Sequence, residues 1–180
     1  LDTSGSMFDV GLRSQGRNLN YFIAGYTIDP EFNTEVGFVR RRDIKAVTSR
    51  LGYLWWPESW LINWGPEVSY GRNYNFEDVL EDETRQVGVN FSFAKNIRFG
   101  VGVNQDMERF GGINFNKRRY STNLFMSTFD AISVGGFLSF GDQVRFSESP
   151  FLGTGSSGSI FLTVRPLSRL QAQININTSR

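Results

Sequence analysis

The sequence predicts an all-β protein, an antiparallel up-and-down β-barrel that crosses a membrane with its strands. Apolar and polar residues alternate in about ten short segments, and no run approaches the roughly 18 apolar residues of a spanning helix. Aromatic residues are abundant, with 17 Phe, 6 Tyr and 4 Trp in 180 residues. A membrane strand needs only about 9–11 residues with every second one apolar, so a mean hydropathy of −0.30 is compatible with this prediction.

The composition excludes several functional classes. The chain has no His and no Cys, which removes disulfides, thiol nucleophiles, imidazole bases and the usual zinc ligands. Its 19 Lys+Arg and 18 Asp+Glu give a net charge of +1, which offers no electrostatic basis for binding nucleic acid. We therefore expect no enzyme activity, no catalytic residues, no cofactor, no metal site and no nucleic-acid partner.

The clearest strand pair spans residues 86–104, where valine and phenylalanine alternate with small or polar residues on both sides of a tight turn at 94–96. Each strand of this hairpin therefore has one apolar face. Similar patterns place further strands at residues 8–13, 19–28, 46–55, 62–71, 120–127, 132–141, 160–165 and 170–177.

Connection lengths give a second regularity. Short links are expected at 14–18, 57–60, 94–96, 128–131 and 166–169, and long ones at 29–43, 72–85, 105–119 and 142–157. Alternation of short turns with long loops is the plan of a bacterial outer-membrane barrel, with the long loops outside. We therefore predict location in the outer membrane of a Gram-negative-type bacterium, with membrane lipid and lipopolysaccharide as partners.

The alternation assigns each strand residue to one of two environments. Apolar positions are predicted to face lipid: Ile62, Trp64, Val68, Val87, Val89, Phe91, Phe93, Phe99, Val101, Leu124, Leu138, Leu162 and Ile174. Their polar neighbours are predicted to line the lumen: Asn63, Glu67, Asn90, Arg98, Asn104, Asn123, Gln171, Gln173 and Asn175. Small uncharged polar groups suit a crowded lumen, and we expect Glu67 and Arg98 to form a luminal ion pair.

Aromatic residues near the strand ends predict the interfacial girdles of a barrel, because amphipathic rings settle at the headgroup boundary. They are Trp55, Trp56, Trp60, Tyr70 and Tyr74; a small aromatic core under a loop is the alternative. Hydrocarbon cannot satisfy a bare strand edge, so about ten strands must close or continue into others. We expect residues 1–180 to be one barrel segment of a longer chain and the whole barrel to be larger.

The segment at 29–44 carries a motif in which Phe32 precedes the triplet Gly37-Phe38-Val39, followed by Arg41 and Asp43. This motif resembles that of a bacterial family of uncharacterised outer-membrane proteins, in which an N-terminal domain similar to family-nine carbohydrate-binding modules precedes a C-terminal β-barrel. The resemblance implies that this chain is part of the barrel and that a periplasmic or surface domain of the same parent protein is a partner.

Three loop segments contain residue types that are common in binding sites. Arg40, Arg41 and Arg42 could form a cationic patch for lipopolysaccharide phosphates or an anionic solute, but pairing with Glu31, Glu35 and Asp43 in a solvated loop is favoured. The glycine-rich stretch at 153–158 lacks the lysine of a phosphate-binding loop and is predicted to be a flexible external loop. An acidic cluster lacks calcium-loop spacing and is predicted to be a hydrated loop: Glu77, Asp78, Glu81, Asp82 and Glu83.

The function that these features favour is a membrane anchor or solute pore for a larger exported protein. Two alternatives remain open. One is a structural subunit of an outer-membrane assembly with a plugged lumen, and the other is a soluble β-sheet module that binds sugar or protein on an aromatic face.

Overall fold

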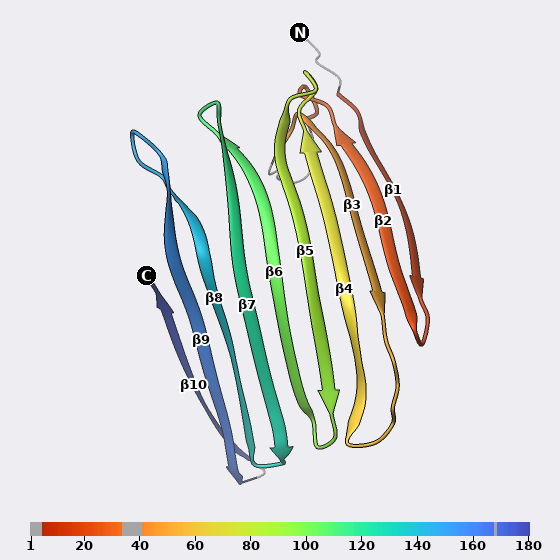
Figure 1. Ribbon diagram of the computed structural model, residues 1–180, viewed down its shortest axis with the longest axis vertical. Helices are drawn as coiled ribbons and strands as arrows, with labels where there is room; N and C mark the ends of the chain where they lie inside the picture. The colour runs from red at the N-terminus through yellow and green to blue at the C-terminus, as the bar shows by residue number, and fades with distance from the viewer. Residues whose placement is uncertain (1–4, 34–40, 168) are drawn as a thin grey trace.

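A computed structural model describes residues 5–33, 41–167 and 169–180, which form ten antiparallel β-strands in one sheet (Figure 1). Among these residues there is no helix of the length and apolarity needed to cross a membrane. The strands are β1 (Met7–Gln15), β2 (Leu19–Ile28), β3 (Ile44–Tyr53), β4 (Leu61–Tyr74), β5 (Leu80–Phe93), β6 (Ile97–Phe110), β7 (Ile113–Phe129), β8 (Ile132–Arg145), β9 (Phe151–Leu167) and β10 (Leu170–Ser179).

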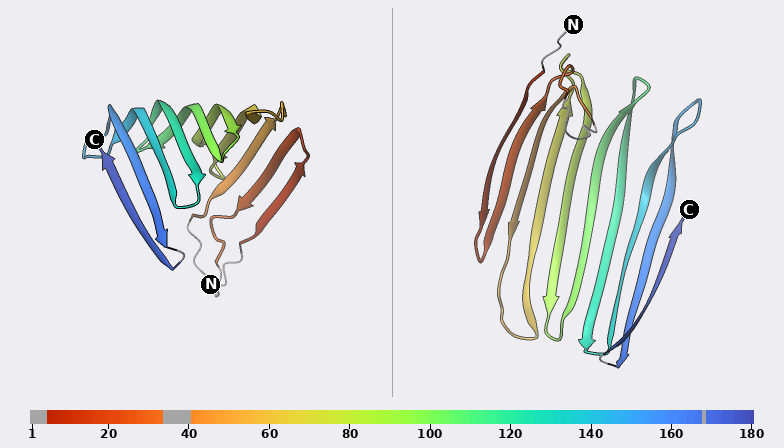
Figure 2. Two further views of the ribbon diagram at one scale, coloured as in Figure 1. Left: turned by 90° about the horizontal axis from the view of Figure 1, so that it is seen from below. Right: turned by 180° about the vertical axis from the view of Figure 1, so that it is seen from behind.

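The strand order equals the sequence order. Each of β2 to β9 therefore pairs with both the strand before it and the strand after it. The sheet curls into a trough rather than lying flat, as the view along the strands shows (Figure 2). Within the described ranges β1 and β10 do not pair, so the sheet is open along these two edges. The predicted all-β, up-and-down architecture with ten strands is confirmed, and these ten strands by themselves do not close into a barrel.

Strand register keeps apolar residues on one face across neighbouring strands. Val89 of β5 lies opposite Val101 of β6, which lies opposite Thr122 of β7, while Asn90 lies opposite Gly100. Because side chains alternate in direction along each strand, this register gives the sheet an apolar outer face and a polar inner face below the level of Val68 and Val103. The predicted alternation is therefore preserved from strand to strand.

Tight hairpins join the longest strands. Lys95 and Asn96 both have positive φ, 64° and 57°, as do Gly111 at 58° and Gly112 at 80°. Gly111 and Gly112 alone separate β6 from β7, and two successive residues of positive φ are what such a two-residue turn of type I′ requires, whereas the β5–β6 link at 94–96 has three residues. The predicted turn at 94–96 is confirmed.

The predicted long connections are mostly wrong. β4 continues to Tyr74 and β5 begins at Leu80, and only Gly111 and Gly112 separate β6 from β7. At the other end of the sheet the link at 54–60 is longer than several connections that were expected to be long, so connection length does not alternate. The strands instead extend past the apolar alternation as polar hairpins, because backbone pairing needs no apolar side chains.

The glycine-rich stretch at 153–158 belongs to β9 and is not a flexible loop. Gly153 pairs with Gln143, and Gly158 pairs with both Leu138 and Thr178. Serine and glycine at these positions hide the alternation of apolar and polar residues. Their backbone groups nevertheless pair β9 with β8 on one side and with β10 on the other.

Gly65 occupies the tightest place in the backbone. Trp55 and Trp64 exchange two backbone hydrogen bonds, of 2.9 and 3.1 Å, in an isolated bridge beyond the end of β3. Pro66 has no N–H to contribute to the ladder here. A β-carbon on Gly65 would lie 1.7 Å from the carbonyl oxygen of Tyr53, so no other residue fits without moving the backbone.

Candidate functional site

The predicted lumen residues lie together on the inner face. Asn90, Gly100 and Asn123 form one row across β5, β6 and β7. A β-carbon on Gly100 would lie 2.6 Å from Asn123 Oδ1 and 2.7 Å from Asn90 Oδ1, so both amides lean over this glycine. Small polar groups thus cover the middle of the inner face, as the sequence predicts.

A polar hollow of about 450 Å³ lies at the lower end of the inner face, over β1 to β4. Arg13 lies over the ring of Phe22, with its guanidinium carbon 5.1 Å from the ring centroid. Arg50 Nε lies 3.6 Å from Glu67 Oε1. The hollow therefore carries two cationic side chains and one carboxylate, all accessible to water from the inside of the trough.

The predicted ion pair between Glu67 and Arg98 is wrong. Glu67 on β4 and Arg98 on β6 are separated by β5, and Glu67 pairs instead with Arg50 on the adjacent strand β3. The Arg98 guanidinium lies over the ring of Phe125, 4.7 Å from its centroid. The register puts Glu67 and Arg98 on the same face of the sheet, but sequence patterning did not identify the neighbour that each contacts.

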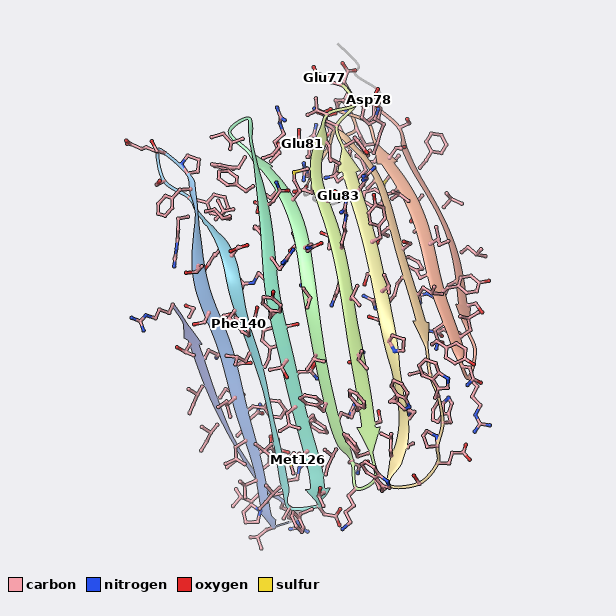
Figure 3. The ribbon with its side chains drawn as sticks, viewed as in Figure 1. Glu77, Asp78, Glu81, Glu83, Met126 and Phe140 are labelled. Carbon is pink, nitrogen blue, oxygen red and sulfur yellow. The ribbon has the colours of Figure 1, made fainter. Side chains whose placement is uncertain are left out.

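The predicted lipid-facing residues share the opposite face, where Val87 is 55% exposed and Val101 is 43% exposed. Ile62 is the exception to the regular pattern, since the register shifts between Leu61 and Asn63. Figure 3 shows two further outer-face residues, Met126 at the lower end of the sheet and Phe140 higher up. Exposed aliphatic side chains over most of one face are what a lipid-contacting surface requires.

A row of stacked aromatic rings crosses the lower outer face. Trp55 lies 4.6 Å from Trp64, Trp64 lies 6.1 Å from Phe91, and Phe91 lies 6.1 Å from Phe99, all measured between ring centroids. Trp60 stacks on Phe93 in the next row and is 72% exposed. Trp55 and Trp60 of the predicted girdle thus join a larger aromatic belt.

The other predicted girdle residues make polar contacts. Trp56 Nε1 donates a hydrogen bond of 2.8 Å to the carbonyl oxygen of Arg17. At the upper end, Tyr70 donates from its hydroxyl to Glu83 at 3.1 Å, and the Tyr74 hydroxyl accepts from Arg72 at 3.3 Å. Aromatic rings with hydrogen-bonded polar atoms therefore lie at both ends of the apolar band, and such rings fit an interfacial position.

The loop motif and the acidic cluster are brought together. Gly37, Phe38 and Arg40 lie outside the described residues. Arg41 Nη1 lies 2.9 Å from Asp82 Oδ2 on β5, a partner outside the loop that the sequence did not predict. Asp43 accepts a hydrogen bond of 2.7 Å from the backbone N–H of Phe76, which ties the end of this loop to the β4–β5 hairpin.

The acidic side chains gather at the upper ends of β4 and β5, as Figure 3 shows for Glu77, Asp78, Glu81 and Glu83. Glu81, Asp82 and Glu83 belong to β5 and not to a loop. Asp78 is paired with Lys45, and Asp82 with Arg41. Neighbouring cations therefore neutralise much of the cluster, and no group of three or more acidic side chains among the described residues is arranged to hold a metal ion.

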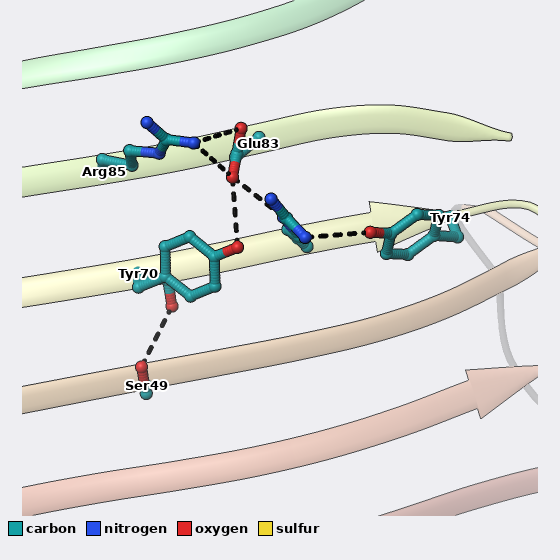
Figure 4. A network of polar contacts seen from close by, with 6 residues as sticks. Ser49, Tyr70, Tyr74, Glu83 and Arg85 are labelled. Atoms are coloured by element: carbon teal, nitrogen blue, oxygen red, sulfur yellow. Dashed lines mark hydrogen bonds and ion pairs between the residues drawn. The ribbon is translucent and has the colours of Figure 1, made fainter.

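One polar network was not predicted. Glu83 accepts hydrogen bonds from Arg72 at 2.8 Å, from Arg85 at 3.0 Å and from Tyr70, and all four side chains belong to the outer face (Figure 4). Residues 72–85 were expected to be a loop, which hid this arrangement. The sequence does carry a signal for it. Tyr70, Arg72 and Tyr74 occupy every second position, which continues the outer face of β4 past its apolar part.

The fold is similar to that of an outer-membrane porin. The crystal structure of Pseudomonas aeruginosa OccK5 (OpdH) matches 97% of this chain with a TM-score of 0.69 and 11% sequence identity. The chain spans about half of OccK5, covering 52% of its length. No family model and no curated protein matches the chain, so the resemblance carried by the loop motif remains a prediction.

Proposed function

We propose that this chain forms part of the wall of a solute pore in the outer membrane of a Gram-negative bacterium. The separation of a continuous apolar outer face from a polar inner face over ten strands carries this proposal. The likeness of its fold to an outer-membrane porin supports it. In this role the protein is a channel and not an enzyme.

The inner face favours hydrophilic solutes of low specificity. Asparagine, glutamine, serine and glycine cover most of it, and such side chains offer both donors and acceptors without a strong field. The arginines at the lower end, Arg13, Arg50 and Arg98, add fixed positive charge that Glu67 only partly neutralises. We infer that small anions enter this part of the pore more readily than small cations.

Conductance in planar bilayers tests the pore. A closed barrel that contains these ten strands, refolded with detergent, should insert and give discrete current steps, whereas a plugged assembly subunit or a pure anchor for an exported domain would insert without steps. Solubility without detergent would favour the soluble binding module instead. Heat-modifiable migration on gels, typical of closed barrels, should accompany insertion.

Reversing the charge of Arg98 should shift ion selectivity. Arg98→Glu replaces a luminal cation with an anion, so the reversal potential measured across a potassium chloride gradient should move toward cation preference. Arg109→Glu makes the same charge change near the tip of the β6–β7 hairpin on the outer side, and it should shift the potential much less. Equal shifts would contradict the assignment of Arg98 to the lumen.

A further inference from the structure

The outer face changes character at the upper ends of β5 to β8. Val103 lies opposite Tyr120 in the last apolar row, and in the next row Gln105 lies opposite both Arg85 and Arg118. A hollow of about 430 Å³ opens at this level. Six of the residues bordering it are Glu83, Arg85, Gln105, Asn116, Arg118 and Asp142.

Around this hollow the two arginines are more exposed than the carboxylates that border it. The Glu83 side chain is 12% exposed, whereas the Arg85 side chain that it anchors is 56% exposed. The Asp142 carboxylate is already engaged with the backbone, since its Oδ2 accepts a hydrogen bond of 2.8 Å from the N–H of Arg118. With its amide oxygen turned toward Arg118, Gln105 accepts from Nη2 at 2.6 Å and from Nε at 3.1 Å.

Arg85 is thus held through its Nη2 by Glu83, Arg118 is held through its Nη2 and Nε by Gln105, and both arginines line the hollow. Planar guanidinium groups match the oxygens of phosphate and bind them with charge-assisted hydrogen bonds. A hollow with two such groups at its rim is therefore suited to an anionic group bearing several acceptor oxygens.

An apolar groove lies on the same face below the hollow. Tyr120 and Phe140 stack at 5.2 Å in the row between them. The groove has a volume of about 470 Å³ and runs over Leu124, Leu138, Ile160 and Ile176, where Gly136 and Gly158 leave room because they have no side chain. Arg118 and Thr122 are four residues apart, so roughly 13 Å of strand joins the hollow to the groove.

We propose that the hollow and the groove together bind one phosphorylated glycolipid of the outer leaflet. Arg85 and Arg118 hold its phosphate, the Tyr120–Phe140 pair lies at the headgroup boundary, and an acyl chain lies in the groove. This inference rests on the proposed function, because it requires the outer face to be embedded in the membrane with the extended hairpins on the external side.

Binding of diphosphorylated lipid A to the folded protein in uncharged detergent tests the proposal. The double variant Arg85→Gln/Arg118→Gln should bind at least about tenfold more weakly than the unmodified protein, the change expected from losing one good charge-assisted hydrogen bond. The matched control is Arg119→Gln, which removes the same charge from the adjacent residue on the inner face, where Arg119 donates to Ser139. This control should bind lipid A normally.

Two further measurements use the unmodified protein and do not depend on variants that fold. Raising the salt concentration should weaken lipid A binding, because salt screens the attraction between the exposed arginines and the phosphate. Millimolar inorganic phosphate should compete poorly with lipid A, because it lacks the acyl chain. Salt-independent binding, full displacement by inorganic phosphate, or equal affinity in all variants would overturn the proposal. If lipid A binding fails these tests but the double variant still gives current steps in planar bilayers, the lipid site is wrong and the proposed pore is still supported.

Discussion

Arginine at position 101 is expected to prevent the protein from inserting into membranes. Val101 lies in the middle of the apolar face, opposite Val89 and Thr122, and is 43% exposed. An arginine facing lipid at the bilayer midplane costs roughly 2–4 kcal/mol. Refolding of Val101→Arg into vesicles should therefore leave most of the protein unfolded or aggregated, as measured by heat-modifiable migration and by protease protection.

The matched variant is Asn90→Arg, one residue beyond Val89 on β5 and on the inner face. Asn90 lies opposite Gly100, and a longer polar side chain at this position can extend away from the sheet into the open trough. We expect this variant to insert nearly as well as the unmodified protein. Equal loss of insertion for the two variants would show that the inner and outer faces are assigned incorrectly.

Gly65→Ala is the second substitution with a large expected effect. Its β-carbon would meet the Tyr53 carbonyl oxygen at 1.7 Å, so the backbone bridge between Trp55 and Trp64 must break or shift. We expect a strongly reduced yield of folded protein and a changed near-ultraviolet circular dichroism signal, since Trp55 and Trp64 would no longer stack at 4.6 Å.

Gly71→Ala is the control for this steric effect. It lies on the same strand and the same face, but its β-carbon would be 3.7 Å from the nearest atom, the carbonyl oxygen of Val47, which is ordinary van der Waals contact. It should fold normally. Comparable losses in the two variants would mean that alanine is disfavoured in β4 generally and that the close approach at Gly65 is not the cause.

The strands could be predicted where one face contacts an apolar environment and the other a polar one. The pairing of residues 86–93 with 97–104 is an example, because valine and phenylalanine mark every second position there. Above Val68 and Val103 both faces are polar, so alternation disappears although pairing continues through Arg72, Glu83 and Met107. Hydropathy therefore marks where the apolar band ends, and it does not mark where the strand ends.

The candidate sites were harder to predict, because contacts across a sheet depend on register and strand order. The face of Glu67 follows from its place in β4, but its partner is Arg50 because β3 is adjacent and the β6 residue Arg98 is two strands away. The outer-face network around Glu83 likewise depends on extending β4 and β5 by several residues. Because the predicted strands ended several residues too early, the Glu83 network could not be predicted.

Pairing of every strand with its sequence neighbours has a consequence for how such a wall can vary. Among the ten described strands none is inserted between two others that are distant in the chain, so each hairpin is a separable module. In the proposed pore, gain or loss of one hairpin would change the circumference by two strands and leave the remaining ladders in register. The width of such a pore could thus change in discrete steps through duplication or deletion of a single β-hairpin.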